Sequence, residues 1–161
     1  MKKILLDTTY ILPIFGIGIK IPNLKEKLLE LEKNSQLLIN SLSILEAKWK
    51  ILKLAKKTPD IIDSFQEGLL FIEKRKIFHI VNFHEYSIDV IATELNRFHK
   101  DYIDCSILAS AYIYADIFIT EEKENMKKLI EKLPHEHTIH RKPETDLKIQ
   151  SISELKPTAE T

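Results

Sequence analysis

Acidic residues recur along this chain at points where an apolar strand pattern meets a helix pattern. Carboxylates that follow the strands of a parallel sheet face the crevice in which open α/β sheets bind ligands. A cluster of carboxylates repels itself unless a cation lies between them, and Mg²⁺ prefers oxygen ligands. The spacing therefore predicts metal-assisted chemistry on a phosphate group. The candidate residues are Asp7, Glu46, Asp104 and Glu122, with Glu121 beside the last of them.

Taken singly, each acid also has a structural explanation. Asp7 and Asp104 suit the start of a helix, where Asp is a favoured residue. Glu46 completes the pattern Ser43-x-x-Glu46, which is typical of a capping box. Glu122 suits the positive end of a helix dipole. Caps do not require acids to converge on one edge of a sheet, so the combination favours a functional site.

The elements that must position these acids alternate between strand and helix. The strand patterns are continuous apolar runs, which indicates a parallel sheet covered on both faces. Right-handed crossovers then place the carboxyl ends of the strands on one edge. Strands are predicted over 3–7, 37–39 and 77–83, over 116–120, and near Thr138 or 148–152; helices are predicted over 23–33, 43–57, 60–74, 84–98, 102–115 and 122–132.

We therefore expect a three-layer α/β/α fold with a central, mostly parallel sheet. The 161 residues, of which 44% are hydrophobic and 30% charged, fit one globular domain over 1–155 with a frayed tail over 156–161. The single cysteine, Cys105, excludes an internal disulfide and fits a reducing compartment. No apolar run approaches the ~20 residues of a membrane helix, so a cytoplasmic protein without a membrane partner is predicted.

The charge is balanced, with 24 basic and 24 acidic residues, which excludes nucleic-acid binding through net charge alone. The distribution is uneven, however, because five lysines crowd the helix predicted over 43–57. Local patches of this kind can contact phosphates. The same helix is expected to turn Leu45, Trp49, Leu52 and Ala55 towards the core.

The four acidic segments resemble the motifs of PIN-domain nucleases. The opening segment Ile4-Leu5-Leu6-Asp7-Thr8-Thr9 resembles their first strand, which is an apolar run that ends in Asp. Ser41-x-Ser43-x-x-Glu46 is similar to their second motif, and 104–111 is similar to their third. The segment 115–122 resembles their fourth, in which a strand ends in Thr-x-Asp. The resemblance covers 3–125 and implies a Mg²⁺- or Mn²⁺-dependent ribonuclease with an α/β/α fold.

Carried over residue by residue, the resemblance implies an acidic core of Asp7, Glu46 and Asp104. The fourth acid is Glu122, where the family usually has Asp, and Asp7, Asp104 and Glu122 are the expected metal ligands. Because Glu has a longer side chain, its neighbour Glu121 and the nearby Glu124 remain alternatives for this position. Thr9, Ser106 and Glu121 are expected to support the site.

The resemblance also implies partners: an RNA substrate, a possible antitoxin protein and a second copy of the chain. The helices over 43–57 and 60–74 are the expected contact in a homodimer. A role as the toxin of a toxin–antitoxin pair and a role in RNA processing both stay open.

Other functions remain as alternatives. A catalytically silent PIN-like module that binds protein or RNA is the main one, because Glu122 departs from the family pattern. A phosphotransfer protein with Asp7 as nucleophile is a weaker one, because Thr9 stands where a second acid is needed. The histidines of 135–140 form an incomplete zinc spacing.

Overall fold

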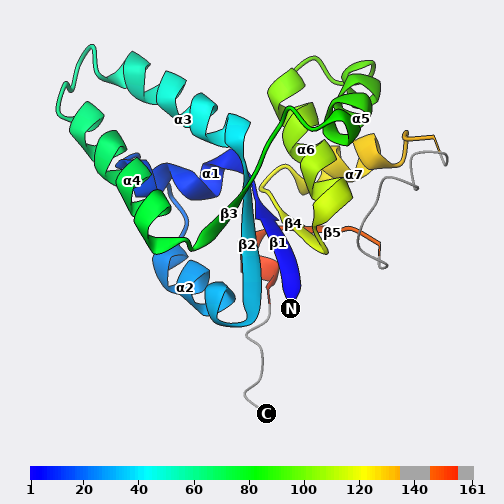
Figure 1. Ribbon diagram of the computed structural model, residues 1–161, viewed down its shortest axis with the longest axis horizontal. Helices are drawn as coiled ribbons and strands as arrows, with labels where there is room; N and C mark the ends of the chain where they lie inside the picture. Colours follow the sequence, from blue (N-terminus) through cyan, green and yellow to red (C-terminus); the bar gives the residue numbers. More distant parts are fainter. Residues whose placement is uncertain (135–145, 156–161) are drawn as a thin grey trace.

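A parallel sheet of five strands, in the order β3-β2-β1-β4-β5, forms the centre of the molecule (Figure 1). The computed structural model describes residues 1–134 and 146–155. Each neighbouring pair of strands is parallel, which confirms the expected fold class. The strands are β1 (Lys2–Leu6), β2 (Ser35–Asn40), β3 (Phe78–Val81), β4 (Ile117–Ile119) and β5 (Lys148–Gln150).

Helices connect the strands and cover both faces of the sheet. Seven α-helices and two 3-10 helices are found in the described ranges: α1 (Thr8–Ile11), η1 (Leu12–Phe15), α2 (Leu24–Asn34), α3 (Ser41–Leu54), α4 (Ile61–Arg75), α5 (Tyr86–Asn96), α6 (Tyr102–Tyr114), α7 (Lys123–Ile130) and η3 (Ile152–Glu154). In Figure 1, α3 and α4 form one arm of the molecule, and α5, α6 and α7 gather on the other side.

The alternation of side chains along the strands creates two hydrophobic cores. Leu5, Leu38 and Phe118 point to one face, where they pack with α5, α6 and α7. Ile4 and Leu6 point to the opposite face, where they pack with η1 and helices α1 to α4. Because successive side chains of a strand point to opposite faces, runs of consecutive apolar residues are what a sheet covered on both faces requires.

The predicted elements match the structure in kind but shift at their ends. The last strand is β5, which lies within the second of the two predicted positions, while Thr138 and 156–161 fall outside the described residues. Strand β2 begins directly after α2, without the expected gap. Nowhere in the described ranges is a helix long and apolar enough to span a membrane.

The predicted orientation of α3 is wrong. Leu45, Trp49 and Leu52 are exposed, whereas Ala47 and Ile51 are buried. The buried side of the helix consists of Leu42, Ser43, Ala47 and Ile51. The small side chains of Ser43 and Ala47 on that side allow the helix to approach its neighbours closely.

Helix α4 packs closely against η1 at Gly68. A Cβ atom at this position would lie 2.5 Å from the carbonyl oxygen of Ile14 and 2.7 Å from the ring of Phe15. Only glycine therefore permits η1 to pack this closely against α4, the helix that forms one arm of the molecule together with α3.

Candidate active site

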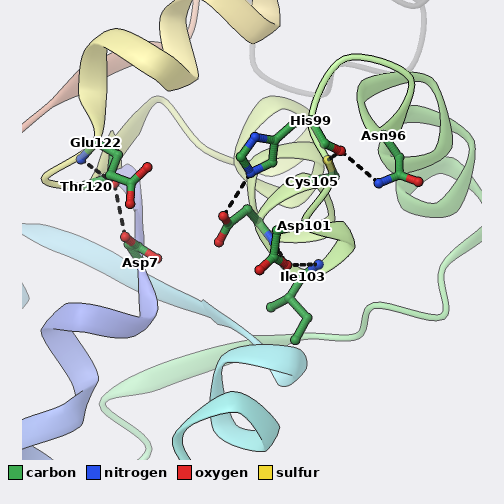
Figure 2. A network of polar contacts seen from close by, with 9 residues as sticks. Asp7, Asn96, His99, Asp101, Ile103, Cys105, Thr120 and Glu122 are labelled. Carbon is green, nitrogen blue, oxygen red and sulfur yellow. Dashed lines mark hydrogen bonds and ion pairs between the residues drawn. The ribbon is translucent and has the colours of Figure 1, made fainter.

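Asp7 stands at the carboxyl end of β1, where the chain turns into α1. Its Oδ1 accepts a hydrogen bond from the backbone N–H of Thr8 at 2.7 Å, so Asp7 caps α1. Its Oδ2 accepts a hydrogen bond from the Thr120 hydroxyl at 3.0 Å (Figure 2). Both partners are neutral, and the carboxylate is held in one orientation at the edge of the sheet.

Glu46 does not belong to a capping box. The cap of α3 is Asn40, whose side-chain oxygen accepts a hydrogen bond from the Leu42 N–H at 2.7 Å. The Ser43 hydroxyl has no hydrogen-bond partner among the described residues. Glu46 therefore lies inside the helix, where its carboxylate pairs with Lys50 at 2.6 Å.

Asn40 also joins the helix of Glu46 to the helix of Asp104. The side chain is fully buried, and its amide donates to the Ser110 hydroxyl at 2.6 Å and to the Ser106 carbonyl at 3.3 Å. A buried amide with both of its ends satisfied fixes the elements that it links. Asn40 thus sets the distance between α3 and α6, and with it the spacing of two candidate acids.

Asp104 lies in the first turn of α6, but it is not the cap of that helix. Asp101 is the cap, because its carboxylate accepts from the backbone N–H groups of Ile103 and Asp104. This leaves the Asp104 carboxylate free to meet the His99 ring, whose Nε2 lies 3.0 Å from Oδ2. The amide of Asn96 donates to the His99 carbonyl at 2.8 Å and helps to fix the loop that carries the ring (Figure 2).

The two neighbouring acids after β4 have different surroundings. Glu121 accepts a hydrogen bond from the buried Tyr10 hydroxyl. Glu122 donates its backbone N–H to the Thr120 hydroxyl at 3.1 Å, and its side chain makes no cap hydrogen bond to α7. Thr120 therefore contacts both Asp7 and Glu122, which Figure 2 shows on one side of the view, with His99 and Asp101 on the other.

Electrostatic repulsion connects the four acids. Burial raises the pKa of Asp7 to about 6, the hydrogen bonds from Thr120 and Thr8 oppose this, and the charges of Asp104 and Glu46 raise it further. Burial also raises the pKa of Asp104, where His99 acts in the opposite direction.

The charge of Glu122 adds to the rise in the pKa of Asp104. Since Asp104 in turn repels Asp7, all four candidate acids are close enough to interact. A site that suppresses ionisation in this way is one that a nearby positive charge stabilises.

The side chains do not form a closed metal-binding group in this arrangement. In the part of the chain that the structure describes, no three His, Cys, Asp or Glu side chains are placed to hold one ion. The reason lies in their partners: Asp104 is turned to His99, Glu46 to Lys50 and Glu121 to Tyr10. The donor set itself is chemically suited to a hard cation, because it consists of mutually repelling carboxylate oxygens.

Three contributors to the site were missed in the sequence. Thr120, Asn40 and His99 orient Asp7, the helix of Glu46, and Asp104 respectively. A sequence signal existed for Asn40, which directly follows an apolar strand run and precedes a helix pattern. A signal existed for Thr120 too, because it is the threonine of the Thr-x-acid end of the fourth motif. No such local signal marks His99, since its contact with Asp104 depends on the tertiary fold.

The remaining predictions have mixed outcomes. The hydrogen bonds to the Asp7 side chain come from Thr8 and Thr120, and the supporting role of Thr9 stays a prediction, as does that of the Ser106 hydroxyl. Cys105 is fully buried, and burial raises the pKa of its thiol to about 11, so it is not an activated nucleophile. The histidines of 135–140 lie outside the described residues.

A cavity of about 610 Å³ lies beside this site and is not part of it. It is lined mainly by apolar residues of η1, α2 and α4. None of the four candidate acids lines it, and only Tyr10, the partner of Glu121, belongs to both. The four acids therefore lie at the carboxyl edge of the sheet, outside this cavity.

Comparison with known proteins supports the fold. No family model and no curated protein matches the sequence. Among solved structures, the chain resembles one in the crystal structure of VapBC2 from Rickettsia felis bound to a DNA fragment from its promoter. The TM-score is 0.58 and the sequence identity 17%, with 91% of this chain and 98% of that chain covered. The PIN-like α/β/α fold that the sequence motifs predicted is thus found in the structure.

Proposed function

We propose that this protein is a divalent-metal-dependent endoribonuclease. The observation that carries the proposal is the convergence of Asp7, Glu46, Asp104 and Glu122 at the carboxyl edge of a PIN-like sheet, where their charges repel one another. Repulsion of this kind has no structural benefit, because caps satisfied by single acids do not require four to meet. It is useful where a cation and a phosphate bind together.

The residues of the chain divide the work of such a site. Asp7, Asp104 and Glu122 would hold Mg²⁺ or Mn²⁺, which supplies the positive charge that activates water and stabilises the leaving oxygen. Thr120 and the Thr8 N–H orient Asp7 through the hydrogen bonds described above. His99 orients Asp104 in the same way. Such partners fix the direction in which a ligating carboxylate points.

Glu46 has a different task in this proposal. Its carboxylate is 23% exposed and pairs with Lys50, which places it at the border between the acids and solvent. From there it would orient water or contact the ion through water. Its charge is therefore expected to matter for cleavage and not for folding.

Cleavage of RNA with Mg²⁺, with Mn²⁺ and with excess EDTA tests the proposal. We expect cleavage in either metal, none in EDTA, and a loss of most activity in Asp7→Asn and Asp104→Asn. Asp63→Asn is the matched control, since Asp63 is an exposed carboxylate on α4. Full cleavage in EDTA, or by the double variant of Asp7 and Asp104, contradicts the proposal. RNA binding without any cleavage supports the silent binding module instead.

We further propose a protein partner of the antitoxin kind and association into a homodimer. The basis for the partner is the shared fold with the chain from the VapBC2 structure together with the motif resemblance. The basis for the dimer is the exposed apolar side chains of α4, among them the neighbours Leu70 and Phe71. A mass of one chain by light scattering at every concentration contradicts the homodimer.

A further inference from the structure

Helix α3 exposes a row of large apolar side chains beside the candidate site. Leu45, Trp49 and Leu52 are 37%, 48% and 49% exposed, respectively. Their spacing of four and three residues places them along one face of the helix. A continuous exposed apolar row of this kind marks a surface that binds something.

The same helix is also positively charged. The segment 41–58 holds five lysines and one acid, Glu46, so it carries a formal charge of +4 in a chain whose net charge is zero. The spacing places Lys50 and Lys53 on the face that Trp49 and Glu46 share. Cations next to an exposed aromatic ring complement a ligand that has both phosphates and flat bases.

This surface is continuous with the acids. Lys50 Nζ lies 2.6 Å from the Glu46 carboxylate, and Trp49, three residues after Glu46, lies on the same side of the helix. The bridge from Asn40 to Ser110 fixes the start of the helix against α6, which carries Asp104. A polymer whose phosphate lies at the acids therefore has α3 as its next contact.

We propose that α3 binds the unpaired RNA substrate, with Trp49 stacked on a base and Lys50 and Lys53 in contact with the flanking phosphates. The assignment rests on the proposed ribonuclease function and names the part of the substrate that the enzyme reads. Unpaired RNA fits this surface better than a duplex does, because a duplex keeps its bases stacked inside and cannot offer one to an indole ring. Stacking of this kind tolerates any base.

Trp49 is the only tryptophan in the chain, so its fluorescence reports directly on this surface. The test titrates the full chain in EDTA, where no cleavage is expected, with a labelled single-stranded RNA of mixed sequence. A length of about 12 nucleotides suits the usual site sizes. Anisotropy of the label gives the affinity, and the same RNA annealed to its complement is the comparison. We expect quenching of Trp49 by the single strand and weaker binding of the duplex.

Substitutions separate the two kinds of contact. Trp49→Leu, which keeps an apolar side chain, should weaken binding by about 5- to 150-fold, and Trp49→Phe should retain much of it. Lys53→Gln should lower the slope of log affinity against log salt by about 0.7, as expected for one lost phosphate contact. Lys128→Gln, an exposed lysine on α7, is the matched control and should leave affinity and slope unchanged. Because Trp49 is exposed, these changes spare the core, and thermal melts check the fold.

Several results overturn the assignment. The assignment is wrong if RNA binds without a change in Trp49 fluorescence. It is also wrong if the duplex binds with equal affinity, or if Trp49→Leu binds with unchanged affinity. A fall in the mass of Trp49→Leu by light scattering also overturns the assignment, because α3 is then a contact between copies of the chain. Failure of this surface with intact metal-dependent cleavage leaves the ribonuclease proposal in place. Normal RNA binding without cleavage overturns the ribonuclease proposal and keeps the binding surface.

Discussion

Replacing Asp7 with Asn should stabilise the metal-free protein at neutral pH. Burial, with added repulsion from Asp104 and Glu46, raises the pKa of Asp7 from 3.8 to about 6. In the unfolded chain the carboxyl ionises at its ordinary value. Folding at pH 7 therefore forces an ionised carboxylate into a place that favours the neutral form, which destabilises the native state.

The size of the effect follows from the difference between the two pKa values, which is about two pH units. Each unit is worth about 1.4 kcal/mol, so the ionised Asp7 costs about 3 kcal/mol of the free energy of unfolding. The folded-state value already includes the hydrogen bonds from Thr8 and Thr120. Asn keeps an acceptor for the Thr8 N–H and offers a donor to the Thr120 hydroxyl, so little of the gain is lost.

Because the pKa of Asp7 is higher in the folded state than in the unfolded chain, the stability difference between Asp7→Asn and wild type depends on pH. Below about pH 3 the carboxyl is protonated in both states, so Asp7→Asn and wild type should differ little. Between about pH 4 and pH 6 the unfolded chain loses its proton before the native state does, and the advantage of the variant grows. Above about pH 7 it reaches its full value.

Urea unfolding in EDTA at several pH values between 4 and 8 measures this difference. Asp63→Asn serves as the control for the loss of an exposed carboxylate. Mg²⁺ at 100 times its Kd should then add about 2.7 kcal/mol to wild type and much less to Asp7→Asn. If Asp7→Asn is less stable than wild type at pH 7, or if the difference is constant across pH, the electrostatic reasoning is wrong.

Three further predictions concern single positions. Glu46→Gln should lose cleavage with little change in stability, because Glu46 does not cap α3 and an exposed i,i+4 ion pair is worth only about 0.3–0.5 kcal/mol; unchanged cleavage would remove Glu46 from the mechanism. Glu122→Ala should weaken Mn²⁺ binding, measured by calorimetry, more than Glu121→Ala does, because the Tyr10 hydroxyl holds Glu121. Glu122→Asp should keep or improve the activity with Mg²⁺. If Glu121→Ala weakens Mn²⁺ binding more than Glu122→Ala, Glu121 is the fourth acid. In Gly68→Ala, overpacking should lower the stability measured in urea by about 1–3 kcal/mol, while the higher helix propensity of Ala returns about 1 kcal/mol. A net gain in stability would mean that η1 moves to make room for the methyl group.

The position of the acids could be predicted from the sequence because it depends on local patterns. The apolar run that ends at Asp7 and the strand that ends at Thr120 both identify themselves by composition, and parallel topology then brings their ends together. The sequence also allows Asp116 to be placed away from the acids, because it opens the strand predicted over 116–120. Its carboxylate accepts from the Lys3 N–H at the opposite edge of the sheet, as its place at the start of a strand implied.

The rotation of α3 could not be predicted in the same way. Leu45, Trp49 and Leu52 have the periodicity of a buried helix face, and a pattern alone favours the largest apolar residues for the core. The structure instead buries the face with Leu42, Ser43, Ala47 and Ile51, on which two small side chains allow close approach to the neighbouring helices. Which of two apolar faces is buried depends on the partner, and the partner is not visible in the helix's own sequence.

The partners of the acids help to explain why ionisation of the carboxylate is most unfavourable at Asp7. Asp104 has His99 beside it, and Glu46 has Lys50, so each of these carboxylates has a group that is or can become positively charged. Asp7 has only neutral hydrogen-bond donors and is the most enclosed of the three. Under the proposed metal-dependent function, a cation would therefore be stabilised most by Asp7 and would have to compete with His99 and Lys50 for the other two carboxylates.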